Sequence, residues 1–314
     1  MGIAAAAAGA AVALAGWQVW LHFSRVRAPH ARDDLQEREE PFASVRAEHA
    51  PYRPEAGAPR AARSRDPAVA PLVEQATAVA RRLVERYPAD AEAVATAAQV
   101  HRELGDADLA VAAWQRCLTL DAEFVDAYLG IGSVLVEQGE YAKAEAPLRK
   151  AVALAPDSPQ AAVMLATALM NQGKLRETVA LLEGPAQDAN APMPCLLLLG
   201  QAYLQLKDYA KAKPCFEAAV RKAPEFANAH YGLAMACTRL GQQQEAREHM
   251  KRFQEAESLR LSRQIEDLKR RDDAASVRKA AAEACASAAA ISAAHGDAAE
   301  AERYRREAAR LEEN

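Results

Sequence analysis

The sequence VDAYLGIGSVLVEQGEYAKAEAPLRKAVALAPDS, residues 125–158, decides the fold because its pattern recurs every 34 residues. Apolar, small and turn residues occupy fixed positions in it, and Gly139 and Pro156 close its two halves. A period of about 34 residues with two amphipathic halves is typical of arrays of helix pairs. Five consecutive segments keep this register without an insertion, and they begin at Ala91, Val125, Pro159, Met193 and Ala227.

Each recurring position has a physical reason. Small residues at positions 8 and 20 allow two antiparallel helices to approach closely, Gly at position 15 ends the first helix, and Pro at position 32 stops the second. The pattern resembles the tetratricopeptide repeat family, and the resemblance implies an all-α, right-handed superhelical solenoid of helix pairs. In the second segment the family's positions hold Tyr128, Ile131, Gly132, Leu135, Gly139, Tyr141, Ala144, Leu148, Ala151 and Pro156.

Changes in composition along the chain predict five regions. Residues 1–23 form a hydrophobic membrane anchor or signal segment, and residues 24–68, rich in Pro, Ala and Arg, form a disordered tether. Residues 69–90 keep the register and are expected to form a half repeat that caps the array. Residues 91–260 hold the five repeats, and residues 261–314 hold an extended helix and a degenerate sixth repeat.

Two stretches depart from the regular pattern. Thr178, Gly184 and Pro185 stand within the expected second helix of the third segment, so a short or kinked helix is predicted there. Between Gly241 and Gly296 there is no Gly or Pro, which predicts a long helix, and Asp272 and Asp273 offer an N-cap for a new helix after a bend. We favour a helix that caps the last repeat. The alternative is a short coiled coil that joins two chains as a homodimer through this C-terminal helix.

The first residues predict an association with a membrane. Residues 3–23 carry no formal charge, and these 21 residues are enough to span a bilayer. Arginines follow on the C-terminal side, at Arg25 and Arg27, so the positive-inside rule places the repeats in the cytoplasm. A cleavable export signal with small residues at 13 and 15 is the alternative, and it would place the repeats outside the cytoplasm.

Composition and motifs argue against catalysis and against nucleic acid as a partner. The 314 residues carry a formal net charge of −4, without the clustered Lys and Arg of a nucleic-acid surface. The seven His residues are scattered, and His101 and His230 fall on positions that pack between helices. No metal-binding pair or phosphate-binding glycine loop occurs, so we expect no catalytic residue, no metal and no cofactor. The five Cys residues are expected to be small buried residues.

In the tetratricopeptide family the first helix of each pair lines a concave groove. The resemblance assigns this lining to positions 2, 5, 9, 12 and 13, which are mainly apolar and uncharged in the middle segments. Such a surface favours a helical or extended peptide with periodic apolar anchors. The alternative is that curvature buries part of this stripe between repeats. The candidate partner-binding residues are Leu129, Val136, Val163, Met170, Leu197, Gln201, Leu204, Tyr231 and Met235.

These features predict a membrane-tethered, non-catalytic scaffold whose partners are proteins or peptides held in the groove. The alternative is a structural accessory subunit of a larger membrane, secretion or enzyme complex, with contacts through its convex or C-terminal surfaces. The repeat pattern does not identify the partner, because one repeat fold serves many assemblies. It also leaves open whether the C-terminal helix fills its own groove.

Overall fold

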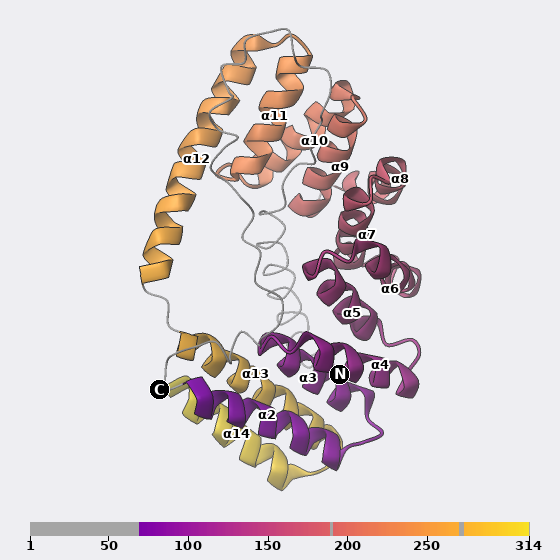
Figure 1. Cartoon of the computed structure of the whole chain (residues 1–314), viewed down its shortest axis with the longest axis vertical. Coiled ribbons are helices and arrows are strands. Elements are labelled where there is room, and N and C mark those ends of the chain that lie inside the picture. The colour runs from indigo at the N-terminus through magenta and orange to yellow at the C-terminus, as the bar shows by residue number, and fades with distance from the viewer. Residues whose placement is uncertain (1–68, 189–190, 270–272, 314) are drawn as a thin grey trace. The chain divides into compact units, whose positions relative to one another are not determined.

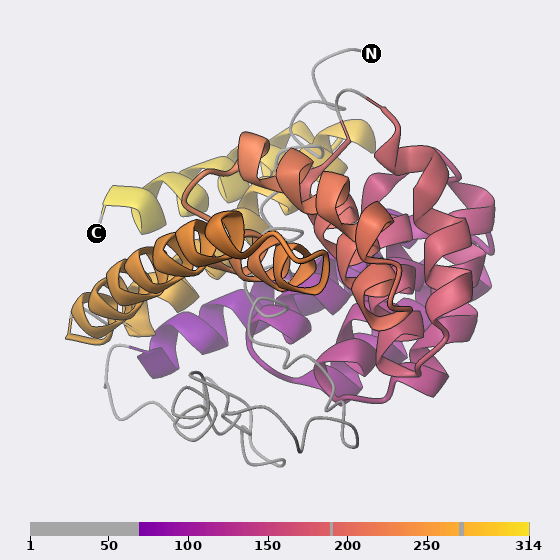
Figure 2. The same ribbon diagram turned by 90° about the horizontal axis from the view of Figure 1, so that it is seen from above.

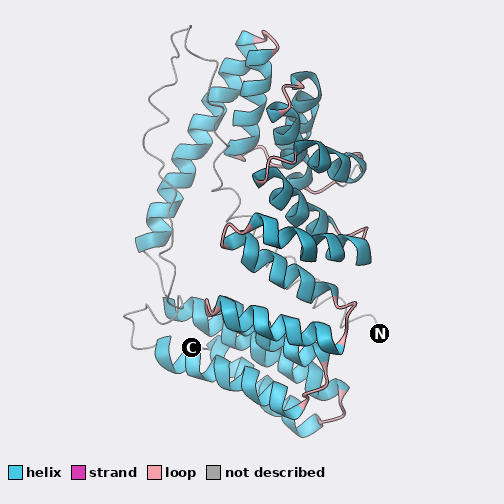
Figure 3. Ribbon diagram, turned by 45° about the vertical axis from the view of Figure 1, so that its right-hand side comes forward, coloured by secondary structure: helices cyan, strands magenta, loops and turns pink. Residues whose placement is uncertain are grey.

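The computed structural model describes residues 69–188, 191–269 and 273–313, which form helices joined by short loops (Figures 1 and 3). Thirteen helices and no strand occur in these ranges. The predicted anchor and tether, residues 1–68, lie outside them. Every helix in the described ranges is too short or too polar to cross a lipid bilayer.

Five helix pairs form the repeat array, and successive pairs lie side by side in chain order (Figures 1 and 2). One helix precedes the array and two follow it: α2 (Val69–Arg86), α13 (Asp273–Ala294) and α14 (Ala298–Glu313). The first helices of the pairs are α3 (Ala91–Glu103), α5 (Val125–Glu137), α7 (Pro159–Asn171), α9 (Met193–Gln205) and α11 (Ala227–Arg239). The second helices are α4 (Ala107–Leu120), α6 (Tyr141–Leu154), α8 (Leu175–Ala186), α10 (Tyr209–Lys222) and α12 (Gln243–Lys269).

A residue with left-handed backbone follows the first helix of each pair. Gly139 has φ 78°, a conformation that glycine adopts without the steric cost met by other residues. The fourth pair differs because Lys207 occupies this position with φ 64°. Within the described ranges Lys207 is the one non-glycine residue with positive φ, so the turn between α9 and α10 carries local backbone strain.

Glycines allow neighbouring helices to approach closely. The Phe216 ring of α10 lies between Gly200 of α9 and Gly232 of α11. A Cβ atom placed on Gly200 would lie 3.0 Å from the ring, and one placed on Gly232 would lie 2.3 Å from it. Gly132 of α5 leaves similar space for Leu148 of α6, which would lie 2.3 Å from an added Cβ. Any side chain at Gly132 or Gly232 would therefore force Leu148 or Phe216 to shift.

The third pair has the short second helix that the sequence predicts. α8 spans 12 residues, whereas α4, α6 and α10 span 14 each. Thr178 is buried in α8, where its hydroxyl donates a hydrogen bond to the Lys174 carbonyl at 3.2 Å. Pro185 lies in the last turn, and the helix ends one residue later.

The C-terminal helix α13 packs against the N-terminal helices α2 and α3, and α14 packs against α13 and contacts Arg82 of α2 (Figure 1). We call these four helices the closing bundle; its core includes Leu83, Val100, Ile291 and Tyr304. The long helix α12 packs against α11 of the last repeat, as expected, whereas α13 packs against α2 and α3 and does not continue this cap. The half repeat leaves one face of α2 without a paired helix, whereas residues 258–263 of α12 are all exposed and offer no apolar core.

Candidate functional site

The first helices of the pairs form one continuous face, because α3, α5, α7, α9 and α11 each pack against the next. We call them the inner helices. Each has 13 residues and the same register, so equivalent positions on successive helices form rows across this face. The nine candidate partner-binding residues lie on α5, α7, α9 and α11.

Packing within the array buries four of the nine candidate residues. Leu129, Val136, Met170 and Leu197 are buried, with exposed fractions between 3% and 9%. They contribute to contacts between neighbouring helices, as expected if curvature buries part of the stripe. The residues that stay accessible are half-buried Val163, Gln201, Leu204 and Met235 and exposed Tyr231. The Tyr231 ring also contacts the Phe253 ring of α12, with centroids 5.3 Å apart.

A polar network covers the inner face of the first two pairs. Arg102 donates to the Glu103 carboxylate at 2.6 Å and to the Gln99 side chain at 3.2 Å, and it lies 3.8 Å from Glu137. Gln99 also donates to Glu103 at 2.8 Å. The Ser133 hydroxyl donates to Glu137 at 3.4 Å. The five side chains occupy groove positions, so the inner face is polar at α3 and α5 and apolar farther along the array.

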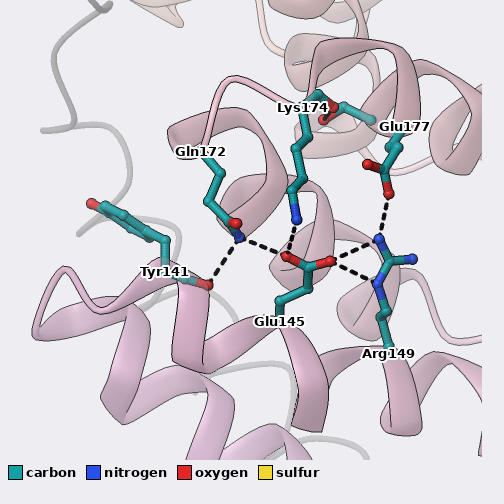
Figure 4. A network of polar contacts seen from close by, with 7 residues as sticks. Tyr141, Glu145, Arg149, Gln172, Lys174 and Glu177 are labelled. Carbon is teal, nitrogen blue, oxygen red and sulfur yellow. Dashed lines mark hydrogen bonds and ion pairs between the residues drawn. The ribbon is translucent and has the colours of Figure 1, made fainter.

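A second network joins the second pair to the third, outside the predicted groove (Figure 4). Glu145 of α6 accepts from Lys174 at 2.6 Å, from Gln172 at 2.9 Å and from Arg149 at 2.9 Å. Arg149 also donates to Glu177 of α8. The hydrogen bond from Lys174 is the largest cause that lowers the pKa of Glu145 to about 2, against the opposing effect of burial. This network locks the register between the two pairs.

The same contact recurs between the fourth and fifth pairs with the charge inverted. Lys213 stands 68 residues, two repeats, after Glu145, and it donates to Gln242 at 3.1 Å and to Glu245 at 2.9 Å. Its other neighbour is Glu217, 3.6 Å away. In the sequence these contacts leave one signal, a repeat position that carries opposite charges two repeats apart, and it was not among the predicted site positions.

The predicted packing role of His230 is confirmed by a histidine pair at the last repeat. His230 is 5% exposed, and its Nε2 lies 2.8 Å from the Pro224 carbonyl. Its Nδ1 lies 3.1 Å from Nδ1 of His249 on α12, and the two rings are stacked. Burial, with the neighbouring His230, lowers the pKa of His249, which favours the neutral ring. Both rings therefore serve helix packing.

The cysteines behave as small apolar residues, as expected. Cys117, Cys195, Cys237 and Cys285 are buried, Cys215 is half-buried, and all five are free thiols. Burial raises the pKa of Cys285 to about 12 and that of each of the others to about 11, which disfavours the reactive thiolate. Among the described residues no group of three or more His, Cys, Asp or Glu side chains is arranged to hold a metal ion.

Two charged contacts close the bundle between segments that are far apart in the chain. Arg86 at the end of α2 donates to Asp297 at 2.5 Å, and Tyr87 donates to the same carboxylate at 3.4 Å. His295, just after α13, lies 2.5 Å from Asp90. The His295 ring also stacks on Tyr87, with centroids 4.5 Å apart. The ends of α2 and α13 therefore meet at the start of α3.

Each carboxylate in these contacts also caps a helix. Asp90 accepts from two backbone amides at the start of α3, and Asp297 accepts from one at the start of α14. Burial opposes ionisation of Asp90, but hydrogen bonds from His295 and the capped amides hold the pKa of its carboxyl below the ordinary value. The Arg86 hydrogen bond is the main cause that lowers the pKa of Asp297. The closing bundle thus depends on ionised carboxylates.

Two family models match the repeat array. The tetratricopeptide repeat model matches residues 95–159 and 197–258, and the model for subunit 3 of the anaphase-promoting complex, or cyclosome, matches residues 137–219. Together with the helix pairs described above, these matches show that the chain belongs to the tetratricopeptide repeat family. The fold of this family is that of a scaffold for protein–protein interaction.

The similarity to known relatives supports the fold and does not identify a partner of this chain. Tetratricopeptide repeat protein 21A of Mus musculus is 36% identical over 84 residues, which are 27% of this chain and only 6% of the mouse protein. YrrB, described as a repeat protein with an unusual peptide-binding site, is 19% identical, with TM-score 0.50 over 56% of this chain and 91% of YrrB. A double mutant of MamA is 22% identical, with TM-score 0.51 over 55% of this chain and 97% of MamA. These structures support an all-α superhelical solenoid.

Proposed function

We propose that this chain is a non-catalytic interaction module that binds a helical or extended peptide of a partner protein along its inner helices. The observation that carries the proposal is the accessible apolar surface on α7, α9 and α11, formed by Val163, Leu204, Met235 and Tyr231. Neither α7 nor α9 contains a charged residue, so an apolar segment would meet no desolvated charge there.

The rigidity of the array favours weak contacts that add up along several repeats. Glycine-dependent packing at Phe216 and the polar network at Glu145 hold successive pairs in register. A preformed surface loses little conformational entropy when a ligand binds, so more of the contact energy contributes to affinity. Members of this family act in general as scaffolds without catalysis, which agrees with the proposal.

The first test selects peptide ligands and then introduces charged residues into the accessible apolar surface. A display library of random peptides of about 12 residues, long enough to cross several helices, is selected on the full chain. Binding of the selected peptides is then measured by fluorescence polarisation. We expect the double variant Leu204→Glu/Tyr231→Glu to bind at least about tenfold more weakly, because a carboxylate would be buried against an apolar ligand.

The control introduces the same change, Leu to Glu, on α4, which is not one of the inner helices. Leu109 of α4 is 54% exposed, so Leu109→Glu should fold normally and bind the selected peptides as the wild type does. Circular dichroism and thermal melting establish that all variants are folded. If no peptide is selected, or if the double variant binds every peptide as tightly as the wild type, the inner helices are not the binding site.

A second candidate function has its own observation. Leu259 and Leu261 on α12 are 44% and 49% exposed and lie in the stretch of α12 that is exposed at every residue. This stretch favours a structural subunit that contacts a partner, or a second copy of the chain, through the C-terminal surface. The variant Leu259→Glu/Leu261→Glu, examined by light scattering and by co-purification, should then lose the assembly, whereas Leu204→Glu/Tyr231→Glu should keep it.

We further propose that residues 1–23 anchor the module to a membrane. The absence of formal charge in residues 3–23 and the arginines that follow support this proposal. Carbonate extraction of membranes should leave the full chain in the pellet and release a variant without residues 1–23. A protease that cannot cross the membrane tests the orientation, because cytoplasmic repeats stay protected in intact cells. Release of the full chain by carbonate would overturn the anchor.

A further inference from the structure

The last residues of the five inner helices change in charge along the array. The helices α3 and α5 end with Glu, α7 ends with Asn, α9 ends with Gln, and α11 ends with Arg. Because consecutive inner helices pack together, these residues follow one another along one edge of the inner face. This edge, which we call the terminal row, consists of Glu103, Glu137, Asn171, Gln205 and Arg239.

The acidic end of the terminal row carries more negative charge than its neighbours balance. Arg102 lies 2.6 Å from Glu103 and 3.8 Å from Glu137, and only 11% of its side chain is exposed. Two carboxylates therefore share one guanidinium, and the Glu137 side chain stays 38% exposed. Both carboxylates stand at helix C-termini, where the helix dipole adds partial negative charge. A cationic side chain would be attracted to this end.

The other end of the terminal row is basic, and the middle of the row is uncharged. Arg239 is exposed at the end of α11, and no ion pair to it occurs among the described residues. Asn171 and Gln205 are uncharged amides at the ends of α7 and α9, which carry Val163 and Leu204 of the accessible apolar surface. The ends lie several helices apart, beyond the ~8 Å over which salt leaves charges unscreened at physiological ionic strength. Each end therefore acts on its own part of a ligand.

We propose that the inner face selects a bipolar segment of a partner protein: an apolar centre, Lys or Arg over α3 and α5, and Asp, Glu or a free carboxylate over α11. This inference rests on the proposed function and specifies its ligand. Four steps between helices of roughly 9 Å each correspond to about ten residues of extended chain. Segments with acidic residues at both ends are repelled by Glu103 and Glu137. The terminal row thus sets the direction in which a segment binds.

The test exchanges only the ends of a peptide that the selection has returned and that requires Leu204 and Tyr231 for binding. Four synthetic forms keep its apolar centre and carry Lys-Arg first and Asp-Glu last, the reverse order, Gln at both ends, or Asp-Glu at both ends. We expect one bipolar form to bind about three- to tenfold more tightly than the Gln form, as two exposed ion pairs would give. The doubly acidic form should bind more weakly than the Gln form, and added salt should reduce both differences.

Two neutral substitutions locate the effect on the terminal row. Glu137→Gln keeps the closer Arg102 and Glu103 pair, and it should remove most of the advantage that the basic end confers. Arg239→Gln should remove the advantage of the acidic end alone. Glu123→Gln, at an exposed position in the turn before α5, is the matched control and should change nothing.

The outcomes separate this inference from the proposed function. If the Gln form binds as tightly as both bipolar forms, the inference is overturned while the inner helices remain the binding site. If the bipolar preference survives Glu137→Gln and Arg239→Gln, the terminal row does not produce it, and the inference is overturned as well. If the selection returns no peptide that needs Leu204 and Tyr231, the proposed function itself fails.

Discussion

The repeat array and the closing bundle are both built from helix pairs, but they bring together residues at very different distances along the chain. In the array, Lys174 meets Glu145 across 29 residues and Glu245 meets Lys213 across 32. In the closing bundle, the contacts of His295 and Asp297 span 205 and 211 residues. Array contacts form between neighbours and add up repeat by repeat, whereas the bundle must close a loop through the whole array. We therefore expect α13 and α14 to separate from α2 and α3 without unfolding of the array.

The largest effect is expected in the core of the closing bundle. Tyr304 is 1% exposed, and its ring lies 5.6 Å from the Arg82 guanidinium. Tyr304→Ala would leave a cavity among small side chains and should destabilise the bundle by about 3–5 kcal/mol. In hydrogen exchange, α13 and α14 should lose protection while the amides of α6 to α10 keep theirs.

The control for this variant makes the same substitution outside the bundle. Tyr231→Ala removes a side chain that is 41% exposed, so protection in the bundle should not change. An equal loss of protection in α6 to α10 of the Tyr304→Ala variant would mean that the array and the closing bundle unfold as one unit.

The next prediction concerns the close packing of helices in the array, which an added methyl group would disturb. A methyl group on Gly232 would lie 2.3 Å from the Phe216 ring, so Gly232→Ala should lower the free energy of unfolding by about 1–3 kcal/mol. Gly200→Ala brings a methyl group only to 3.0 Å from the same ring, and the gain in helix propensity is the same in both variants, so its cost should be clearly smaller. Urea titration followed by circular dichroism compares the two variants. Equal costs would show that the ring moves freely.

The polar contact between the second and third pairs should contribute about 1 kcal/mol, since its partners are partly exposed. The pKa of Glu145 lies at about 2, below its ordinary 4.5, so the contribution is complete above pH 4.5 and is lost as the pH falls toward 2. Glu145→Gln should therefore be less stable than the wild type at neutral pH, with a difference that shrinks in acid. A double-mutant cycle with Lys174→Met isolates the pair. A difference independent of pH would assign the effect to packing.

The smallest effect is a gain in stability at the turn between α9 and α10. Lys207 has φ 64°, so Lys207→Gly should stabilise the chain by up to about 1 kcal/mol through the removal of backbone strain. The reverse change at the equivalent turn, Gly241→Lys with φ 79° in the wild type, should cost a similar amount. Thermal melting measures both. No change in either variant would show that the strain is relieved elsewhere.

Local repetition made the array predictable. The glycine and proline columns located the helix pairs from Ala91 onward, and Thr178, Gly184 and Pro185 indicated the short α8. The candidate site was predictable as a set of positions on the inner helices, because a helical period decides which residues share a face. It was not predictable which of them remain accessible. Leu129 and Tyr231 occupy the same repeat position, yet one is 6% and the other 41% exposed.

The sequence by itself determined the all-α fold, the repeat register and the buried roles of His230 and of Cys117, Cys195 and Cys237, because each depends on contacts within about one repeat. The tertiary structure alone decided where α13 and α14 pack, which candidate residues stay open, and how Arg102 joins Glu103 to Glu137. These features depend on contacts between segments whose separation leaves no periodic signal. Only the tertiary structure shows which face of α2 the C-terminal helices cover.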